Sequence, residues 1–191
     1  MKKIIIADYD EQWPKQFQQL KEMYTNALGD LITAVEHVGS TAVPGLAAKP
    51  IIDIDLVITD EDKLDKIIPL LSGLGYEFRG DLGIKDRYAF NAISEYVPVT
   101  ATKHKWPKHH LYCCIAHSIS LQNHLVLRDA LRINPTLATA YADLKRMLAA
   151  NVNDDIDAYV EGKTAFISKI LADGGLSAAN VLEIGEQNKK K

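Results

Sequence analysis

Two acidic residues, Asp53 and Asp55, stand out in an otherwise apolar stretch of the chain, Ile51–Ile58. Residues two apart on a β-strand project from the same face, so this stretch predicts two carboxylates side by side. Neighbouring carboxylates in apolar surroundings repel each other and lose hydration, and a divalent cation relieves both penalties. We therefore predict that Asp53 and Asp55 bind Mg²⁺ together with a nucleotide phosphate.

The turn Gly39-Ser40 lies twelve residues before this acidic pair. A glycine lets the backbone approach a phosphate closely, and the serine hydroxyl and nearby backbone N–H groups donate to phosphate oxygens. The alternative is that the acidic pair lies at an exposed strand edge and has no function. The apolar residues around the pair favour a functional role for the two acids. The residues of this region that we predict to bind phosphate are Gly39, Ser40, Thr41 and Lys49.

Two basic residues fall on apolar faces of predicted C-terminal helices. Lys163 lies at the centre of the apolar face of a helix predicted from Ile156 to Leu171. Arg128 lies in an apolar arc of an earlier helix, predicted from about Leu121 to Ile133. A buried cation is costly unless it meets an anion, so we predict that both residues bind phosphate. The alternatives are that Lys163 extends past its neighbours to water and that Arg128 pairs internally with Asp129 or with Glu161.

Periodicity places these residues in a mixed fold. An amphipathic helix is predicted over about residues 11–28, followed by strands at 31–38 and 51–58 and a helix ending near Leu74. Three shorter strands are predicted at 76–79, 87–93 and 111–115, and after residue 119 the pattern is helical, with the last residues expected to fray. The fold class is therefore α+β, with an α/β N-terminal part, one mixed sheet and a C-terminal helical lobe.

Composition limits the classes of function. The chain has 191 residues and a net charge of −3, which fits one ordinary domain and argues against a broad nucleic-acid surface. The adjacent Cys113 and Cys114 are expected to be buried free thiols in a reducing compartment. Without a membrane-length apolar run or a signal peptide, the expected location is cytoplasmic and no membrane partner is expected. Oligomeric state is not indicated.

The run His37–Ile54 resembles the signature of the GrpB family, and so do several shorter motifs over about residues 4–171. These motifs are Asp8-Tyr9-Asp10 with Trp13-Pro14, His109-His110-Leu111, Leu127-Arg128-Asp129, Leu131-Arg132, Asn134-Pro135, Tyr159 and Gly162-Lys163. The resemblance implies a nucleotidyltransferase-like fold of the polymerase-β type, in which Gly-Ser and Asp-x-Asp form the metal and triphosphate motif. Members of the family also occur fused to dephospho-coenzyme A kinase, which implies a partner that is a nucleotide or another phosphorylated small molecule.

One departure from that superfamily concerns a third carboxylate, which usually lies on a later strand. The strand expected near residue 111 carries none, so His110 is the predicted substitute, as ligand or base, beside Asp53 and Asp55. Asp81, Asp86 or Glu95 from loops are the alternatives. The first hypothesis for the function is an Mg²⁺-dependent nucleotidyltransferase that transfers a nucleotidyl group to an unknown acceptor. Because the third acid is missing, the alternatives are a non-catalytic module that binds a nucleotide or a coenzyme A precursor, and a protein-interaction domain.

The predicted domain covers residues 1–172, with its sheet part at about 1–116, its helical lobe at about 117–172 and an extension at 173–191. The segment Thr102–His110 carries three lysines and three histidines around Trp106. It fits either a basic lid over an anionic substrate or a solvated loop.

Overall fold

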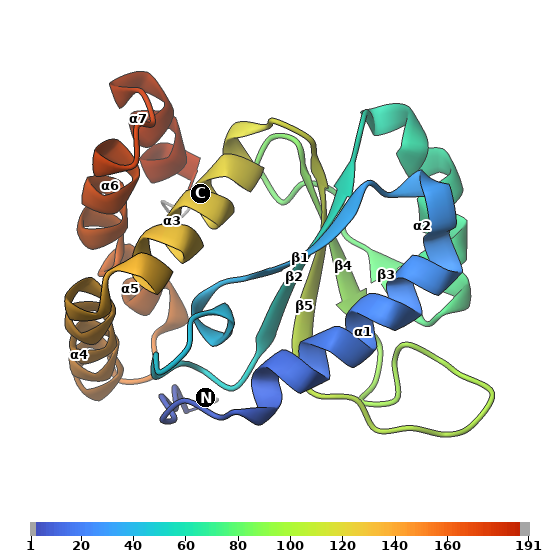
Figure 1. The fold of residues 1–191 in the computed structure, drawn as a ribbon, viewed down its shortest axis with the longest axis horizontal. Coiled ribbons are helices and arrows are strands. Elements are labelled where there is room, and N and C mark those ends of the chain that lie inside the picture. Colours follow the sequence, from blue (N-terminus) through green and yellow to red (C-terminus); the bar gives the residue numbers. More distant parts are fainter. Residues whose placement is uncertain (1–2, 188–191) are drawn as a thin grey trace.

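A computed structural model describes residues 3–187, and five strands in it form one mixed sheet (Figure 1). The strands are β1 (Ala34–Val38), β2 (Ile52–Ile58), β3 (Tyr76–Phe78), β4 (Arg87–Ala92) and β5 (His109–Ile115). Their order across the sheet is β1-β2-β5-β4-β3. β2 and β5 run parallel, and the other neighbouring pairs are antiparallel. The predicted α+β class with a mixed sheet is confirmed.

The helices lie in two groups on either side of the sheet (Figure 1). The first group is α1 (Gln12–Leu28) and α2 (Leu64–Gly73), and the second is α3 (Ile119–Ile133), α4 (Pro135–Asn151), α5 (Ile156–Glu161), α6 (Thr164–Asp173) and α7 (Ala178–Gln187). Short 3₁₀ turns occur at Gly29–Leu31, Ser40–Ala42 and Glu61–Lys63. Because the first of these turns occupies the predicted start of the first strand, β1 begins only at Ala34.

The main core lies between the sheet and the pair α1 and α2. Alternate residues of β2 enter it, and the large side chains buried there are Ile52, Ile54, Leu56, Ile58, Leu20, Tyr24, Ile67 and Leu71. The strand's period of two then directs Asp53 and Asp55 to the opposite face, toward the C-terminal helices. The burial of one face therefore fixes which way the two acids point.

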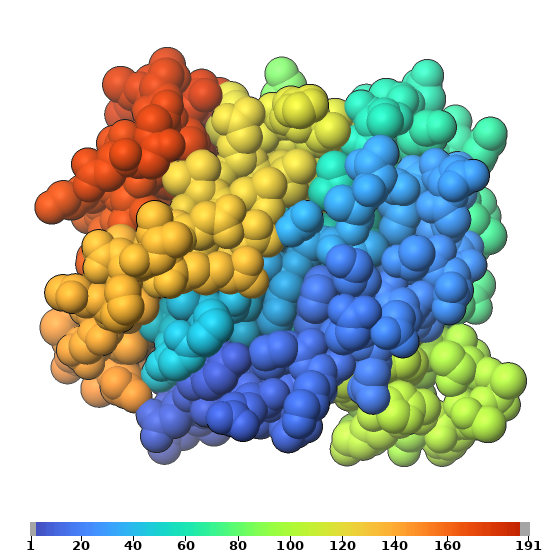
Figure 2. Space-filling model, in the orientation of Figure 1, coloured from blue at the N-terminus to red at the C-terminus, as the bar shows by residue number. Residues whose placement is uncertain are grey.

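A second core forms around the loop that connects β1 to β2. Val43, Leu46 and Ala47 of this loop pack against Leu131 and Tyr141 of the C-terminal helices. The space-filling view shows the loop, in cyan, lying directly against the yellow and orange helical segments (Figure 2). The loop and the helices are therefore fixed to each other by apolar packing. Nowhere in residues 3–187 does a helix have the length and apolar character needed to cross a membrane.

The prediction of one continuous helix from Ile156 to Leu171 is wrong. The chain breaks at Gly162, whose N–H bonds to Ala158 O, and α6 starts only after Lys163. A Cβ on Gly162 would lie 2.5 Å from Leu148 Cδ2, so the break brings the backbone close to α4. Lys163 therefore sits at a helix junction rather than at the centre of a continuous helical face.

The residues expected to fray include a helix, α7, in the described part of the chain. Ile184 of α7 is only 4% exposed, and α7 packs beside α6 and α3. The apolar spacing of Val181 and Ile184, three residues apart, gives α7 a face to bury. The final Lys189–Lys191 lies outside the described residues.

Candidate functional site

Asp53 and Asp55 lie on the same face of β2, but their exposure differs. The Asp53 side chain is 32% exposed and the Asp55 side chain is fully buried. Each carboxylate accepts a hydrogen bond from a histidine: His110 Nδ1 lies 2.8 Å from Asp53 Oδ1, and His124 Nδ1 lies 2.7 Å from Asp55 Oδ2. The second oxygen of Asp55, Oδ1, is buried and has no hydrogen-bond partner among the described residues.

Gly39 is the residue that lets the turn after β1 lie against Asp53. The antiparallel register pairs Val38 with Asp53, so the next residue passes beside that carboxylate. Gly39 has φ +69°, and a Cβ built on it would overlap Asp53 Oδ2 and lie 3.0 Å from Cγ. The position therefore needs glycine both for its left-handed backbone and for the close approach of the two groups.

Ser40 is held by Lys145, a residue that our sequence analysis did not single out. Lys145 Nζ donates to Ser40 Oγ at 2.8 Å and to Ala47 O, and the residue is 2% exposed. Burial, with help from the charges of Lys163 and Arg146, lowers the pKa of Lys145 to about 7.

The signal for Lys145 was present in the sequence. Ala138, Tyr141, Ala142 and Lys145 follow the i, i+3, i+4, i+7 spacing of one buried helix face. The criterion of a cation on an apolar face, which we applied to Arg128, therefore also selects Lys145.

Two further lysines gather on the buried ring of Tyr159. Lys49 Nζ lies 4.3 Å and Lys163 Nζ 4.7 Å from the ring centroid. Burial and the charge of Lys49 lower the pKa of Lys163 to about 8, while Asp53 acts in the opposite direction. These ammonium groups therefore lie within electrostatic range of Asp53 in a setting that favours an added anion.

A cavity of about 220 Å³ opens between the sheet and the helices at this point. Gly39, Ser40 and Asp53 line one side of it, and Arg128 and Lys163 line the other. The structure thus brings together these five sequence-predicted residues around one hollow.

The other predicted residues lie outside that lining. The Thr41 hydroxyl is buried, lies 3.0 Å from His37 Nε2 and donates to Ile51 O, so it stabilises the loop. Asp55 lies deeper in the sheet, and Lys49 approaches from the loop before β2.

Arg128 lines the cavity, but its guanidinium is already bonded to two carboxylates. Its guanidinium donates to Glu36 Oε2 at 2.6 Å and to Asp129 Oδ1 at 2.7 Å, and it also contacts His37 O. Its pKa is raised because these carboxylate contacts outweigh burial, which acts the other way. The internal pairing with Asp129 is one of the alternatives that we set out for Arg128, whereas Glu36 was not anticipated.

A larger groove of about 560 Å³ lies on the same sheet face, beyond His110. It is lined by Tyr112 on β5, by Asn91 on β4, and by Lys105 and Trp106 of the loop that connects β4 to β5. His110, with a side chain 49% exposed, lines this groove while bonding to Asp53, which lines the smaller cavity. His110 therefore links the two hollows.

No third carboxylate joins Asp53 and Asp55 in a metal-binding cluster within residues 3–187. The register places His110 and Tyr112 of β5 opposite Asp53 and Asp55, and Glu36, opposite Asp55 on β1, is bonded to Arg128. The oxygen of Asp55 without a partner and the half-buried carboxylate of Asp53 are nevertheless the hard oxygen donors that suit Mg²⁺.

Comparison with known proteins gives close matches over most of the chain. The GrpB protein family model matches residues 3–173. The UPF0157 protein YqkA of Bacillus subtilis is 32% identical over 87% of this chain and 46% of its own length. The chain thus spans less than half of that relative. A dephospho-CoA kinase of Mycolicibacterium paratuberculosis is 28% identical over 81% of this chain and 42% of that protein.

Solved structures give a match to the same family. The conserved protein GrpB from Enterococcus faecalis is 33% identical, covers 89% of this chain and 96% of its own, and superposes with a TM-score of 0.74. A cytoplasmic RNA terminal U-transferase, 12% identical over 83% of this chain and 49% of its own, has a TM-score of 0.57, which shows likeness of fold alone. With its family model, its relatives and this structural match in agreement, the chain belongs to the GrpB family and has a nucleotidyltransferase-like fold.

Proposed function

We propose that the protein binds a nucleoside triphosphate with Mg²⁺ in the 220 Å³ cavity and transfers a nucleotidyl group to an acceptor. The observation that carries this proposal is the contact of Gly39 with the Asp53 carboxylate, across the cavity from Lys163. A carboxylate, a tight glycine turn, a serine and a buried lysine at one hollow supply both a metal ligand and phosphate donors. The nucleotidyltransferase-like fold supports this assignment.

Asp53 and Asp55 are the residues that would hold Mg²⁺, with Asp55 Oδ1 free to coordinate. When bound, the ion would neutralise phosphate charge and orient the triphosphate for displacement. Ser40 Oγ and Lys145 Nζ, already hydrogen bonded to each other, would donate to the terminal phosphates. Lys163 would add positive charge at the same hollow, where the phosphate would offset the cost of burying an ammonium group.

The 560 Å³ groove is our proposed place for the acceptor. His110 lies between this groove and Asp53, and its Nδ1–H bond to Asp53 leaves Nε2 as the ring nitrogen that can accept a proton. His110 would therefore orient the acceptor hydroxyl and take its proton, a role that a third carboxylate fills in related folds. Tyr112 and Trp106 offer ring surfaces for packing against a planar group.

One observation favours a second candidate, a non-catalytic sensor. The strand β5 presents His110 and Tyr112, not an acid, opposite the two aspartates. Binding without transfer needs only the cavity and its lysines. The relative that is a dephospho-CoA kinase supports a coenzyme A precursor as the ligand of such a sensor.

A thermal-shift assay with ribonucleoside triphosphates, coenzyme A and dephospho-coenzyme A, each with and without Mg²⁺, tests binding. A triphosphate at 100 times its Kd should stabilise the protein by about 2.7 kcal/mol, and only with Mg²⁺ present. Asp53→Asn should remove this shift while the ligand-free Tm stays near or above that of the wild type, since it relieves repulsion between the two acids. Asp65→Asn, an exposed acid on α2 across the sheet, is the matched control.

Two outcomes contradict the proposal. One is a wild-type Tm that no triphosphate raises, and the other is an Asp53→Asn variant that keeps the full shift. Incubation with α-labelled triphosphates and cell extract then separates the two candidates. Label attached covalently to an acceptor supports transfer, whereas Mg²⁺-dependent binding without attachment supports the sensor.

A further inference from the structure

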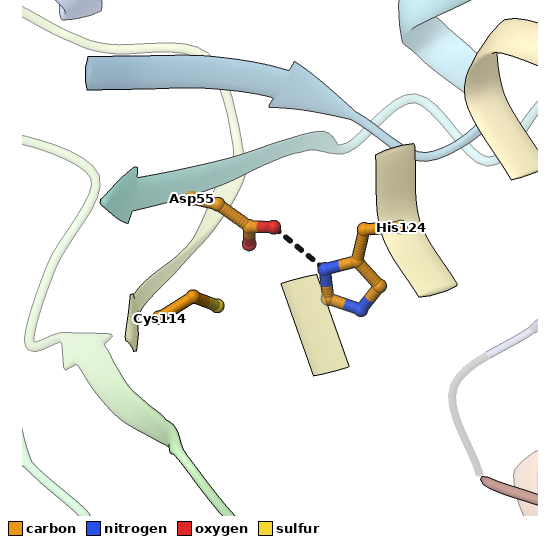
Figure 3. Close-up of side chains that lie close together, drawn as sticks. All are labelled: Asp55, Cys114 and His124. Atoms are coloured by element: carbon orange, nitrogen blue, oxygen red, sulfur yellow. Dashed lines mark hydrogen bonds and ion pairs between the residues drawn. The ribbon is translucent and has the colours of Figure 1, made fainter. Parts of the chain in front are cut away.

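A second group of metal-ligating side chains lies deeper in the molecule than the cavity. Asp55 of β2, Cys114 of β5 and His124 of α3 point toward one another (Figure 3). One ligand atom from each residue lies within 4.8 Å of the others, and Asp55 and Cys114 are fully buried. Three different ligand types thus converge from three separate elements.

Unsatisfied polar atoms mark the same region. Asp55 Oδ1 and Asn123 Oδ1 are both buried without a hydrogen-bond partner in the described chain. Asn123 is the neighbour of His124 on α3, and both residues line the 220 Å³ cavity, which gives an entry path to the cluster. A buried acceptor without a donor costs free energy, and a bound cation at Asp55 would remove that cost.

The charges around the cluster decide which kind of cation fits. Arg87 pairs in register with Cys114, and its guanidinium lies 4.5 Å from the centroid of the Tyr112 ring. This positive charge lies next to Cys114, so a cation held by Cys114 and His124 must gain from strong ligand bonds and not from electrostatics alone. A thiolate and an imidazole form strong bonds with Zn²⁺ or Co²⁺.

The distances require only a small adjustment. Zinc bonds of about 2.0–2.3 Å in a tetrahedral site place ligand atoms roughly 3.3–3.8 Å apart. The three ligand atoms, at most 4.8 Å apart, therefore need to approach by no more than about 1.5 Å. Side-chain rotation of His124, whose side chain is 21% exposed, is available for this movement.

We propose that Asp55, Cys114 and His124 bind a thiophilic divalent cation of the Zn²⁺ class, with the fourth position open toward the cavity. Binding replaces the Cys114 thiol proton, which passes to solvent, and the imidazole of His124 binds through Nδ1. This site does not depend on the nucleotide proposal, because it needs no phosphate. Since Asp55 belongs to both sets of residues, Zn²⁺ here would prevent Asp55 from binding Mg²⁺.

Co²⁺ titration of the reduced protein, freed of metal by a chelator, tests the site directly. The wild type should develop a near-ultraviolet thiolate-to-cobalt band and the intense visible bands of a tetrahedral site. Zn²⁺ should abolish both, whereas excess Mg²⁺ should leave them unchanged. Loss of a partner outside the ligand shell typically weakens metal affinity by 10–100-fold, so Cys114→Ser should weaken Zn²⁺ binding by more than about 100-fold.

The adjacent thiol provides a matched control. Cys113 is also fully buried, but it packs in the core on the opposite face of the sheet. Cys113→Ser should therefore keep the cobalt spectrum and the Zn²⁺ affinity, while Cys114→Ser loses the thiolate band. His124→Ala, at a partly exposed helix position, is the second ligand variant if Cys114→Ser fails to fold, and it should weaken Zn²⁺ binding by a similar factor.

Three results would overturn the assignment. The first is a wild-type protein without a thiolate band, and the second is a band that survives in a folded Cys114→Ser variant. The third is Zn²⁺ affinity that His124→Ala leaves unchanged. Because the readout is spectroscopic and uses metal alone, these failures are distinct from a failure of the nucleotide proposal.

Discussion

At the scale of single residues, close packing determines the identity of the groups at the site. Gly39 is required by its backbone angle and by the Asp53 carboxylate beside it. Asp55 and His124 share a buried hydrogen bond that raises the pKa of His124, since the carboxylate outweighs the opposing effect of burial. Each of these groups therefore depends on a neighbour that is distant in the sequence.

Two glycines of the loop between β1 and β2 allow the cost of backbone strain to be distinguished from the cost of steric overlap. Both have positive φ, +69° at Gly39 and +76° at Gly45, but a Cβ on Gly45 would meet nothing within 4 Å. Gly45→Ala should therefore cost only about 1 kcal/mol in the free energy of unfolding, the cost of left-handed alanine. Gly39→Ala should cost about 2–3 kcal/mol because Asp53 must also move. Equal losses for the two variants in urea unfolding would show that the carboxylate contact is unimportant.

The buried Lys145 should make stability depend on pH. Its pKa is about 7 in the folded protein against an ordinary value of 10.5, so between these values the unfolded chain binds more protons. Stability should therefore rise, relative to Lys145→Met, as pH increases from about 7 toward 10.5, because the folded protein holds this lysine neutral and the cost of removing its proton falls as pH rises. Urea unfolding of both proteins at several pH values measures the difference. Parallel stability curves would contradict the assignment.

Loss of the charge on Lys145 should weaken anion binding, although it raises the stability of the folded protein. Inorganic triphosphate should bind more weakly as pH rises from 6 to 9, since Lys145 and Lys163, with pKa values of about 7 and 8, lose their charge over that range. Isothermal titration calorimetry gives the Kd at each pH. The trend should be reduced in Lys145→Met, and an affinity independent of pH in the wild type would remove both lysines from the site.

At the scale of elements, neighbouring residues of β5 project from opposite faces of the sheet and have different roles. His109 bonds to Tyr76 on the side of α1, while His110 bonds to Asp53 on the other side. Cys113 and Cys114 repeat this alternation near the end of the strand. A strand between two packed layers thus supplies core residues and site residues in turn.

The start of α4 is fixed by a cap that the sequence shows plainly. Asn134 Oδ1 accepts from Leu137 N–H, and Pro135 occupies the first helical position. Asn134→Ala should destabilise the protein by about 1 kcal/mol, whereas Asn134→Asp should keep the cap and nearly all of the stability. Chemical denaturation followed by circular dichroism compares the two. Equal destabilisation by both changes would indicate that the cap contributes little.

The elements also show what the sequence could and could not predict. The strand carrying Asp53 and Asp55 was predictable because its apolar pattern and its period are local. The break at Gly162 was not, since the close approach of this glycine to Leu148 on another helix is a tertiary contact. The partners of the site residues, such as Glu36 for Arg128, come from pairings across the fold that no local pattern encodes.

At the scale of the whole molecule, the cavity exists because two layers meet. The sheet supplies the carboxylates and the helices supply the cations, and hydrogen bonds from Arg132 to Ala42 O and from Lys145 to Ala47 O join them. Neither layer alone forms the site. Changes in the packing between the layers should therefore alter ligand binding without touching a cavity residue.

The deep burial of the loop between β1 and β2 has a consequence for dynamics. Four apolar side chains of this loop are each at most 2% exposed: Val43, Leu46, Ala47 and Ala48. Because they are buried in the cores of the protein, the loop is held in one position. Its amide hydrogens should exchange with deuterium as slowly as those of the central strands, while the exposed stretch 100–105 should exchange rapidly. The side of the cavity formed by this loop is therefore in place before a ligand arrives, and binding should not need the loop to reorganise.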